Sequence, residues 1–266
     1  MPEQRDSISN ILWVAVILSL VCALFVSASA VLLRPRQIEN REREEKKNIL
    51  IAADGIFDPK QHTDEDIDRL FEKKVEPKVV DLADSDWYVD PPEGYVQKNA
   101  TQKPDQCDPV PAGKDFASIR KREKLSYVYL VNDENGRPDQ VVLPIRGYGL
   151  WSTLYGFISI DLQSLKQGPE HAIVRGLTYY QHGETPGLGG EVDNPDWKNR
   201  WQGKHVFDEN WNVLIEVSKR ITKPEHQIDA LSGATITSDG VTNMMRYWLG
   251  PEGFGPYLKK LHEELR

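Results

Sequence analysis

One stretch of this chain constrains its fold more than any other: no charged residue occurs between Ser7 and Leu33. Within it, residues 11–33 (ILWVAVILSLVCALFVSASAVLL) contain only three Ser as polar interruptions. About 20 apolar residues cross the hydrocarbon core of a bilayer as a helix. Trp13 lies near one end of the run, where interfacial aromatic residues are favoured. The run therefore predicts a transmembrane helix over residues 11–33, preceded by a short N-terminal tip at residues 1–10.

A cleaved signal peptide is the alternative interpretation of this run, because Ala28-Ser29-Ala30 looks like a small-residue cleavage site. The apolar region of a signal peptide is only about 7–15 residues long, whereas this run continues to Leu33. The length favours a retained anchor. No other stretch approaches the length of a span, so we expect one membrane helix and a large C-terminal domain.

The rest of the chain has the composition of a folded, water-soluble domain, because 28% of the 266 residues are charged and 39% are hydrophobic. The net charge of −8 argues against nucleic acid as a partner, since phosphates require a basic surface. Cys22 lies inside the predicted span and Cys107 lies alone in the soluble part. This separation excludes an intramolecular disulfide.

The pattern of residues after the span predicts an α+β fold with an antiparallel or mixed sheet. We divide this part into a charged stalk, a connector with the first part of the soluble domain, a second part and a C-terminal helix, at residues 34–50, 51–145, 146–249 and 250–266. Runs of β-branched and aromatic residues predict strands over residues 127–132, 140–145, 154–160, 172–180 and 212–217. Apolar residues at helical spacing predict helices over 238–249 and 257–265. Five prolines make residues 88–115 an expected irregular loop.

Several common chemistries are absent from the sequence. It has no Gly-x4-Gly-Lys-Ser/Thr phosphate loop, no Gly-x-Gly-x-x-Gly at a strand–helix junction and no Gly-x-Ser-x-Gly nucleophile motif. The six His form no i,i+4 pair, and no pair of cysteines is spaced for zinc or iron–sulfur binding. We therefore expect no metal site, no nicotinamide site and no ordinary hydrolase site.

Two segments are unusual. Residues 182–191 (HGETPGLGGE), which we name the glycine loop, hold four glycines and one proline in ten residues. Glycine lets backbone N–H groups approach a ligand, although the composition alone favours a plain glycine-rich turn between strands. Residues 229–238 (DALSGATITS), the threonine segment, precede the predicted helix. Thr237 or Ser238 can be read as a helix N-cap, but a helix N-terminus also binds phosphate.

Taken together, these segments resemble the FMN-binding domain family. Asp-x-x-Ser-Gly-Ala-Thr at residues 229–235 is similar to that family's flavinylation motif, and Glu-Thr-Pro-Gly-Leu-Gly at residues 184–189 is similar to its loop beside the isoalloxazine ring. Residues 147–151 (GYGLW), the glycine turn, look like the family's Gly-x-Gly-x-Trp motif. The three motifs occur in the family's order and span most of residues 146–249.

The resemblance implies a set of site residues. Thr235 would carry FMN through a phosphoester bond, installed by a separate flavin transferase that takes FMN from FAD, and Asp229 would be recognised by that enzyme. Lys219 would neutralise phosphate or ring charge. The residues expected to line the ring are Glu184, Thr185, Gly187 and Leu188. The residues expected to surround the phosphate are Ser232, Gly233, Ala234 and Thr237.

Over its full length the chain resembles the C-subunit family of Na+-translocating NADH:quinone reductases. That resemblance implies an electron-carrying subunit of a Na+-pumping NADH:ubiquinone oxidoreductase. Its partners would be the other subunits of a membrane redox complex, including a second membrane subunit with covalent FMN. The alternatives are the G-type subunit of an Rnf complex, which is generally shorter and departs from Gly-Gly-Glu-Val-Asp-Asn-Pro in its loop, a membrane-anchored flavoprotein outside a pump, and an anchored binding module.

The side of the membrane is a point of conflict. Basic residues follow the span at Arg34, Arg36, Arg41, Arg43, Lys46 and Lys47. The positive-inside rule alone would therefore place the large domain in the cytoplasm. The family resemblance implies the opposite, an inner-membrane protein with a cytoplasmic N-terminus and a periplasmic domain. Acidic residues within the same run dilute its charge, so we expect the periplasmic orientation.

Overall fold

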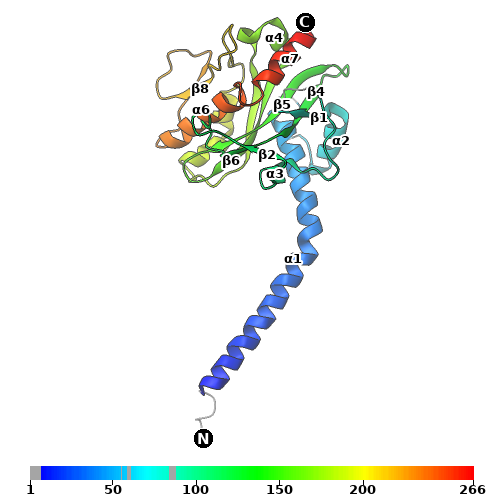
Figure 1. Ribbon diagram of the computed structural model, residues 1–266, viewed down its shortest axis with the longest axis vertical. Helices are drawn as coiled ribbons and strands as arrows, with labels where there is room; N and C mark the ends of the chain where they lie inside the picture. Colours follow the sequence, from blue (N-terminus) through cyan, green and yellow to red (C-terminus); the bar gives the residue numbers. More distant parts are fainter. Residues whose placement is uncertain (1–6, 55, 59–60, 84–87) are drawn as a thin grey trace. The chain divides into compact units, whose positions relative to one another are not determined.

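A computed structural model describes residues 7–54, 56–58, 61–83 and 88–266 of the chain (Figure 1). The chain divides into an N-terminal helical unit, Met1–Glu44, and a folded unit, Glu45–Arg266. Helix α1, Ile8–Ala52, runs through the first unit and into the second. The predicted helix over residues 11–33 is therefore confirmed as helix, and it continues without interruption through the predicted stalk.

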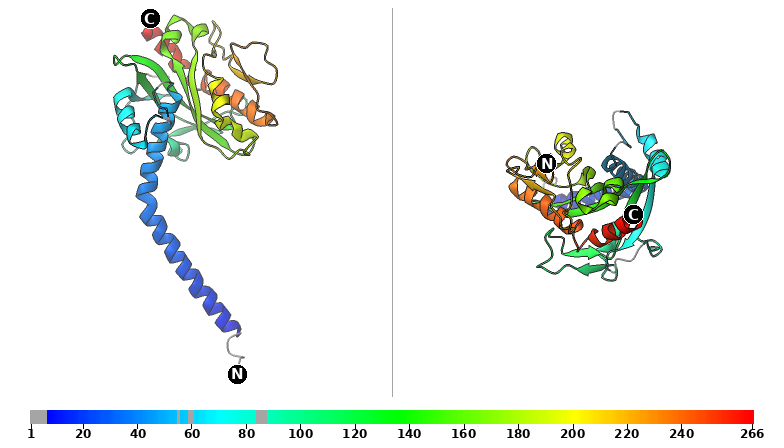
Figure 2. Two further views of the ribbon diagram at one scale, coloured as in Figure 1. Left: turned by 180° about the vertical axis from the view of Figure 1, so that it is seen from behind. Right: turned by 90° about the horizontal axis from the view of Figure 1, so that it is seen from above.

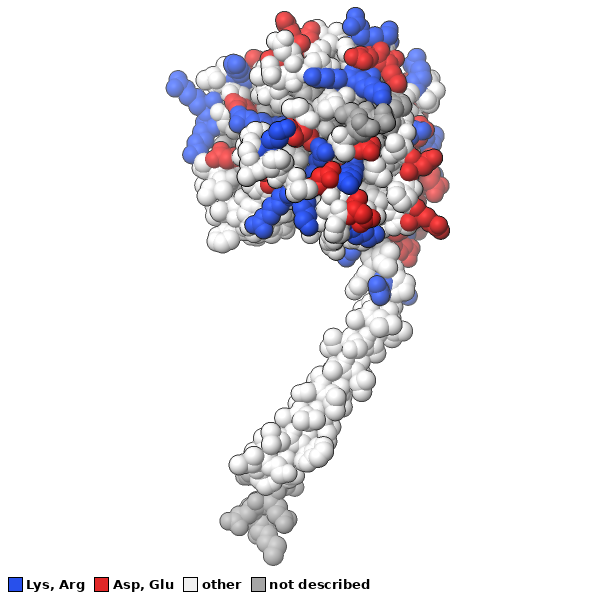
Figure 3. All heavy atoms as spheres, viewed as in Figure 1, with Lys and Arg blue, Asp and Glu red and all other residues white. Residues whose placement is uncertain are grey.

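The apolar part of α1 is exposed along its whole described length. Its side chains from Ile8 to Leu33 are exposed, and in the described part of the chain α1 is the one helix long and apolar enough to cross a bilayer. A helix that is hydrophobic on all sides is stable only where apolar surroundings cover it. Figure 3 shows the contrast, since charged side chains of both signs cover the folded unit and the apolar length of α1 carries none.

A five-stranded antiparallel sheet forms the centre of the folded unit (Figures 1 and 2). Its order is β1-β4-β5-β6-β7. The strands are Val75–Asp81, Leu125–Asn132, Pro138–Tyr148, Thr153–Asp161 and Val174–Gln181. Four of them coincide with predicted strands, and the predicted α+β class with an antiparallel sheet is confirmed.

Strand β1 was not predicted, and its position in the sheet explains why. It contains Pro77 between Glu76 and Lys78, a sequence without the β-branched run of an inner strand. Proline cannot donate a ladder hydrogen bond and is tolerated on an edge strand. Because β1 is an edge strand of the sheet and β4 is its neighbour there, this position accommodates the proline.

A hydrophobic core covers each face of the sheet. The inner strands therefore have continuous apolar sequences. On β5, Val141, Leu143 and Ile145 point into the larger core, whereas Val142 points into the smaller one, as the two-residue period of a strand requires. The larger core lies under α4, α6 and α7, which are Leu162–Gln167, Thr235–Trp248 and Gly255–Leu265. The smaller core lies under the end of α1 and under α2, Asp64–Lys74 (Figure 2).

The last turns of α1 are part of this folded unit. Ile49 and Leu50 are 1% and 0% exposed, and they pack in the smaller core with Tyr129 and Phe157 of the sheet. The buried Thr178 hydroxyl donates to the Asn48 side-chain oxygen over 3.2 Å. The predicted stalk thus ends as a core element rather than as a solvated helix.

Short elements complete the unit. They are α3 Gln97–Ala100, β2 Cys107–Pro109, β3 Lys121–Glu123, η1 Pro169–His171, η2 Gly189–Asp193, α5 Pro195–Asn199, β8 Glu216–Ser218 and β9 Gln227–Asp229. The strand predicted over 212–217 is wrong for most of its length. The Asp208 carboxylate accepts hydrogen bonds from the amides of Asn210 and Asn212, and these local bonds form a turn in place of a strand. Both cysteines are free, as predicted.

Candidate functional site

The three motifs meet at one end of the sheet. The glycine turn joins β5 to β6, closed by a 2.9 Å hydrogen bond from the Gly149 amide to the Ser152 carbonyl. The glycine loop leaves β7, and the threonine segment leads from β9 into α6. Strand β7 pairs with β6, and α6 packs on β5, so the antiparallel topology brings the three connections together.

The Glu184 side chain connects all three motifs. Its Oε1 accepts hydrogen bonds from the amides of Leu150, Trp151 and Ser152 over 3.2, 3.0 and 3.1 Å. Its Oε2 accepts a 2.7 Å hydrogen bond from the hydroxyl of Thr237. Glu184 is only 5% exposed, so its carboxylate is buried and its oxygen atoms are already engaged.

These hydrogen bonds keep the carboxylate ionised. Burial by itself raises the pKa of Glu184, because it disfavours the charged form. Hydrogen bonds from the Thr237 hydroxyl and from the amides of Trp151, Leu150 and Ser152 outweigh burial and bring the pKa below its ordinary value. A carboxylate held by several donors is therefore a fixed negative charge at neutral pH.

Two glycines leave the space that this carboxylate occupies. A Cβ on Gly149 would lie 2.7 Å from Glu184 Oε1, and a Cβ on Gly189 would lie 2.8 Å from Oε2 and 2.6 Å from the Thr237 hydroxyl. Real side chains do not approach so closely. Glycine at positions 149 and 189 thus has a steric reason, because both positions face the same buried carboxylate.

Thr235 is the first residue of α6 and is exposed. Its hydroxyl has no hydrogen-bond partner among the described residues. Ala234 occupies the N-cap position and makes no side-chain cap, so the first-turn amides lack intrahelical acceptors. The predicted start of this helix at Ser238, and the interpretation of Thr237 or Ser238 as its N-cap, were wrong. The Thr237 hydroxyl bonds to Glu184 instead, and the Ser238 hydroxyl accepts from the Leu231 amide over 3.1 Å.

The other expected phosphate and ring residues lie around Thr235. Ser232 and Gly233 are exposed and Ala234 is buried. Leu188 is 44% exposed, and its Cδ2 would lie 3.0 Å from a Cβ on Gly233, so the glycine loop touches the threonine segment here. Thr185 and Gly187 are exposed in the same loop. The fold therefore brings together the ring and phosphate sets that the sequence predicted separately.

Sequence reasoning missed several exposed apolar side chains from these segments. Tyr148, Leu150, Trp151 and Ile236 are 45%, 38%, 66% and 56% exposed. Leu150 and Trp151 belong to the glycine turn itself, so the motif was found and its side chains were left unassigned. With Leu188 they are exposed apolar side chains of the same three segments, one of which holds the exposed Thr235 hydroxyl, and these residue types suit a ligand with a flat apolar part and an anionic tether.

Asp229 is the first residue of the threonine segment, and Lys219 directly follows the strand residue that pairs with it. Strands β8 and β9 pair in parallel with Ser218 opposite Asp229, and the Ala230 amide donates to the Ser218 carbonyl over 3.0 Å. Lys219 follows directly and is exposed. The Asp229 carboxylate is exposed and accepts a 2.9 Å hydrogen bond from Arg200, which leaves it accessible to a macromolecular partner.

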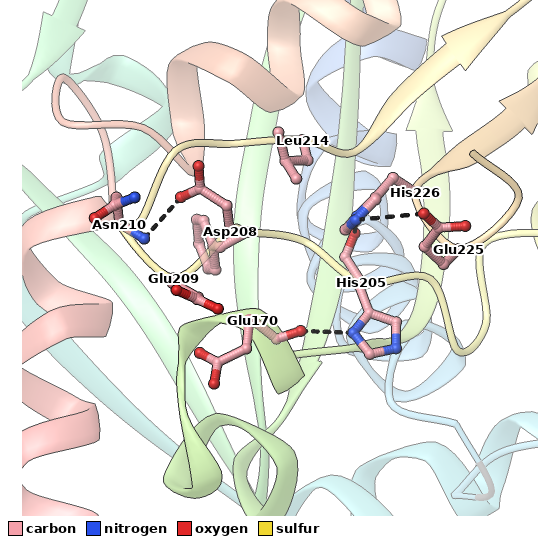
Figure 4. A pocket seen from close by; sticks show the side chains of 9 residues that line it. Glu170, His205, Asp208, Glu209, Asn210, Leu214, Glu225 and His226 are labelled. Atoms are coloured by element: carbon pink, nitrogen blue, oxygen red, sulfur yellow. Dashed lines mark hydrogen bonds and ion pairs between the residues drawn. The ribbon is translucent and has the colours of Figure 1, made fainter. Parts of the chain in front are cut away.

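A separate hollow of about 350 Å3 lies elsewhere on the folded unit (Figure 4). Glu170, His205, Asp208, Glu225 and His226 are among its lining residues. None of them belongs to the three motifs. In the described ranges of the chain, no group of His, Cys, Asp or Glu side chains could hold a metal ion.

Comparison with known proteins shows which kind of domain the chain contains. Residues 149–250 match the family model of the FMN-binding domain, a range that contains the glycine loop and the threonine segment. The folded unit is thus an FMN-binding domain extended by the strands and helices that precede it.

Full-length relatives define the family. The chain is 40% identical over 264 residues to the C subunit of the Na(+)-translocating NADH-quinone reductase of Yersinia pestis, covering 98% of this chain and 96% of the relative. It is 43% identical over 257 residues to the corresponding protein of Haemophilus ducreyi, covering 96% and 95%. The chain belongs to the C-subunit family of Na+-translocating NADH-quinone reductases, which are oxidoreductase complexes.

Solved structures agree with this assignment. The crystal structure of Shewanella oneidensis NqrC superposes with a TM-score of 0.72 at 30% identity, covering 84% of this chain and 99% of that one. The C subunit of the Na(+)-translocating NADH-quinone reductase from Parabacteroides distasonis has a TM-score of 0.60 at 24% identity, covering 86% and 96%. The second likeness shows the same fold.

Proposed function

We propose that this chain is the electron-carrying subunit of a Na+-pumping NADH:ubiquinone oxidoreductase and holds FMN through a phosphoester on Thr235. One observation carries this proposal: an exposed threonine hydroxyl, without a hydrogen-bond partner in the described part of the chain, begins α6 in a family whose domain binds FMN. FMN bound there would supply a carrier that accepts and releases electrons singly.

The residues present fit such a group. The threonine segment offers small residues before α6, Gly233 and Ala234, which leave space beside Thr235. The first-turn amides of α6 point out of the helix end and, with the helix dipole, stabilise negative charge. Thr237 would contact the phosphate through its backbone amide, because its hydroxyl donates a hydrogen bond to Glu184. Exposed Lys219 supplies a positive charge nearby.

The apolar side chains around Thr235 would contact the ring. Leu188 and Trp151 come from two different loops and are exposed together with Ile236 of α6. Thr185 and Gly187 contribute the polar edge of the glycine loop. Covering these apolar side chains would remove exposed hydrophobic surface from water, which favours binding. This supports Thr185, Gly187 and Leu188 of the predicted ring set and adds Trp151 and Ile236 to it.

Attachment requires a balanced transfer. The Thr235 oxygen would form a bond to the FMN phosphorus of FAD, the pyrophosphate bond would break, and AMP would leave while the hydroxyl proton passes to the transferase or solvent. Asp229 is exposed on the approach to Thr235, which supports its proposed role as a recognition residue for the flavin transferase.

The proposed partners are the other subunits of the membrane redox complex, among them a second membrane subunit with covalent FMN. We propose that α1 anchors the chain once in the inner membrane and that the folded unit lies in the periplasm. Protease added to spheroplasts is expected to digest the folded unit. Protection of that unit until the membrane is permeabilised would refute this orientation.

The attachment is tested by mass spectrometry of the peptide around Thr235 after coexpression with a flavin transferase. The native peptide is expected to carry one FMN phosphoryl group, and Thr235→Ala is expected to abolish in-gel flavin fluorescence after denaturation. Thr235→Ser is the conservative variant, because it keeps a hydroxyl at the first residue of α6. Thr222→Ala removes a different exposed threonine and is expected to label normally. Fluorescence retained by Thr235→Ala would refute the attachment site.

A further inference from the structure

The Glu184 carboxylate is buried, and its oxygen atoms already accept hydrogen bonds from the protein. The Glu184 side chain is 5% exposed, and its oxygens accept hydrogen bonds from three amides of the glycine turn and from the Thr237 hydroxyl. Gly149 and Gly189 close against the same oxygens. A ring lying on the exposed surface of Leu188 and Trp151 would therefore meet Glu184 only through the residues that cover it.

We propose that Glu184 is a positioning residue for FMN attachment, which sets the distance between the glycine turn and the start of α6. This inference rests on the proposed function. The carboxylate holds the amides of Leu150 and Trp151, whose side chains belong to the proposed ring surface. Through Thr237 it also holds the first turn of α6, two residues after Thr235. One buried side chain thus orders both the ring surface and the attachment hydroxyl before the flavin arrives.

The rest of the fold does not depend on this carboxylate. The sheet ladder and the larger core under α6 include none of its hydrogen bonds. Loss of Glu184 should therefore loosen the three motifs against each other while the domain stays folded. Loss of a buried residue with a purely structural role would lower stability without a selective effect on labelling.

The experiment uses the full chain in detergent with purified flavin transferase and FAD. Glu184→Gln keeps the size of the side chain and removes its charge, and Thr237→Val removes the hydroxyl that donates to Oε2. We expect each variant to take up covalent FMN about tenfold more slowly, as loss of a hydrogen bond to a charged group implies. Thr237→Ser, which keeps the hydroxyl, should recover most of the native rate. The double variant should be no slower than Glu184→Gln, because Thr237 acts through that carboxylate.

Matched controls separate positioning from general damage. Glu123→Gln alters another buried carboxylate, which pairs with Arg146. Thr242→Val removes another buried hydroxyl of α6, which accepts from the Val217 amide. Both are expected to label at the native rate even where they lower the unfolding temperature. Equal slowing in these controls would overturn the inference.

Hydrogen exchange of the flavin-free chain gives a readout independent of labelling. In Glu184→Gln the amides of Leu150, Trp151 and Ser152 are expected to exchange about tenfold faster than in the native chain. Native exchange there, or native labelling by both Glu184→Gln and Thr237→Val, would overturn the inference and leave the attachment at Thr235 intact. A native chain that is not labelled at all would refute the proposed function and this inference with it.

Discussion

Gly240 of α6 packs against the carbonyl oxygen of Tyr148 so closely that a Cβ at position 240 would lie 2.5 Å from that oxygen. Gly147, one residue before Tyr148, faces Met244 in the next turn of α6. The helix therefore rests directly on the end of β5, where the glycine turn begins. This contact sets how far Thr235 stands from the apolar side chains of that turn.

Replacement of Gly240 by Ala tests this contact. Alanine is the better helix former, yet the added methyl group must displace the backbone of Tyr148. We expect the variant to lose about 2 kcal/mol of unfolding free energy, as overpacking does. Urea denaturation measures it. Asp239→Ala, exposed one position earlier, should stay within about 0.5 kcal/mol of native. A stabilised Gly240→Ala variant would contradict the close contact.

The Glu184 carboxylate gives stability a defined pH dependence. Because hydrogen bonds outweigh burial and lower its pKa in the folded state, it stabilises the fold above the ordinary Glu value of about 4.3. That contribution disappears as the pH falls through the lowered folded-state pKa. The difference in unfolding free energy between native and Glu184→Gln protein should thus shrink between about pH 7 and about pH 3. A constant difference over that range would argue against an ionised Glu184.

Trp151 is expected to affect the flavin environment more than the fold. Its side chain is 66% exposed, so Trp151→Ala should change unfolding free energy by no more than about 0.5 kcal/mol. If Trp151 contacts the ring, the visible circular dichroism of the labelled protein should change. Val96→Ala, at a 50% exposed apolar residue outside the three motifs, should leave that spectrum native. Identical spectra for the Trp151 variant would remove it from the proposed ring surface.

Asp229 is expected to matter for labelling rather than for stability. Its ion pair with Arg200 is exposed at both ends, and such pairs contribute about 0–1 kcal/mol. Asp229→Asn should therefore unfold like the native chain and label more slowly with flavin transferase and FAD. Arg200→Gln breaks the same pair while keeping the carboxylate and should label normally. Slow labelling by both variants would show that the transferase requires the pair.

The end of α1 is expected to behave as part of the domain core. Leu50 is fully buried in the smaller core, so Leu50→Ala should lower the unfolding free energy by about 2–5 kcal/mol. Ile38→Ala, at a 48% exposed position of the same helix, should change it by less than about 0.5 kcal/mol. Tryptophan fluorescence during denaturation in detergent measures the unfolding free energy of both variants. Equal effects would mean that the helix end does not contribute to the core.

Features that depend on local composition could be predicted from the amino-acid sequence. The apolar run at residues 11–33 and four of the five strands of the sheet could be read directly, because length, hydrophobicity and β-branching are properties of neighbouring residues. Strand β1 was not predicted, because its sequence contains Pro77 with charged residues beside it, which only an edge position tolerates. Residues 212–217 mimicked a strand because the bonds of Asp208 that form the turn lie just upstream.

The assembly of the candidate site depends on contacts between distant parts of the chain. The motifs identified Thr235 and the glycine loop, but Glu184 and Thr237 are 53 residues apart, and no local pattern encodes their hydrogen bond. The sequence likewise placed the helix start at Ser238, whereas packing on β5 extends the helix back to Thr235. Antiparallel pairing of β5, β6 and β7 brings the glycine turn and the glycine loop to one end of the sheet, and packing of α6 on β5 brings the threonine segment there. Burial there leaves the Glu184 carboxylate hydrogen-bonded to the protein's own amides.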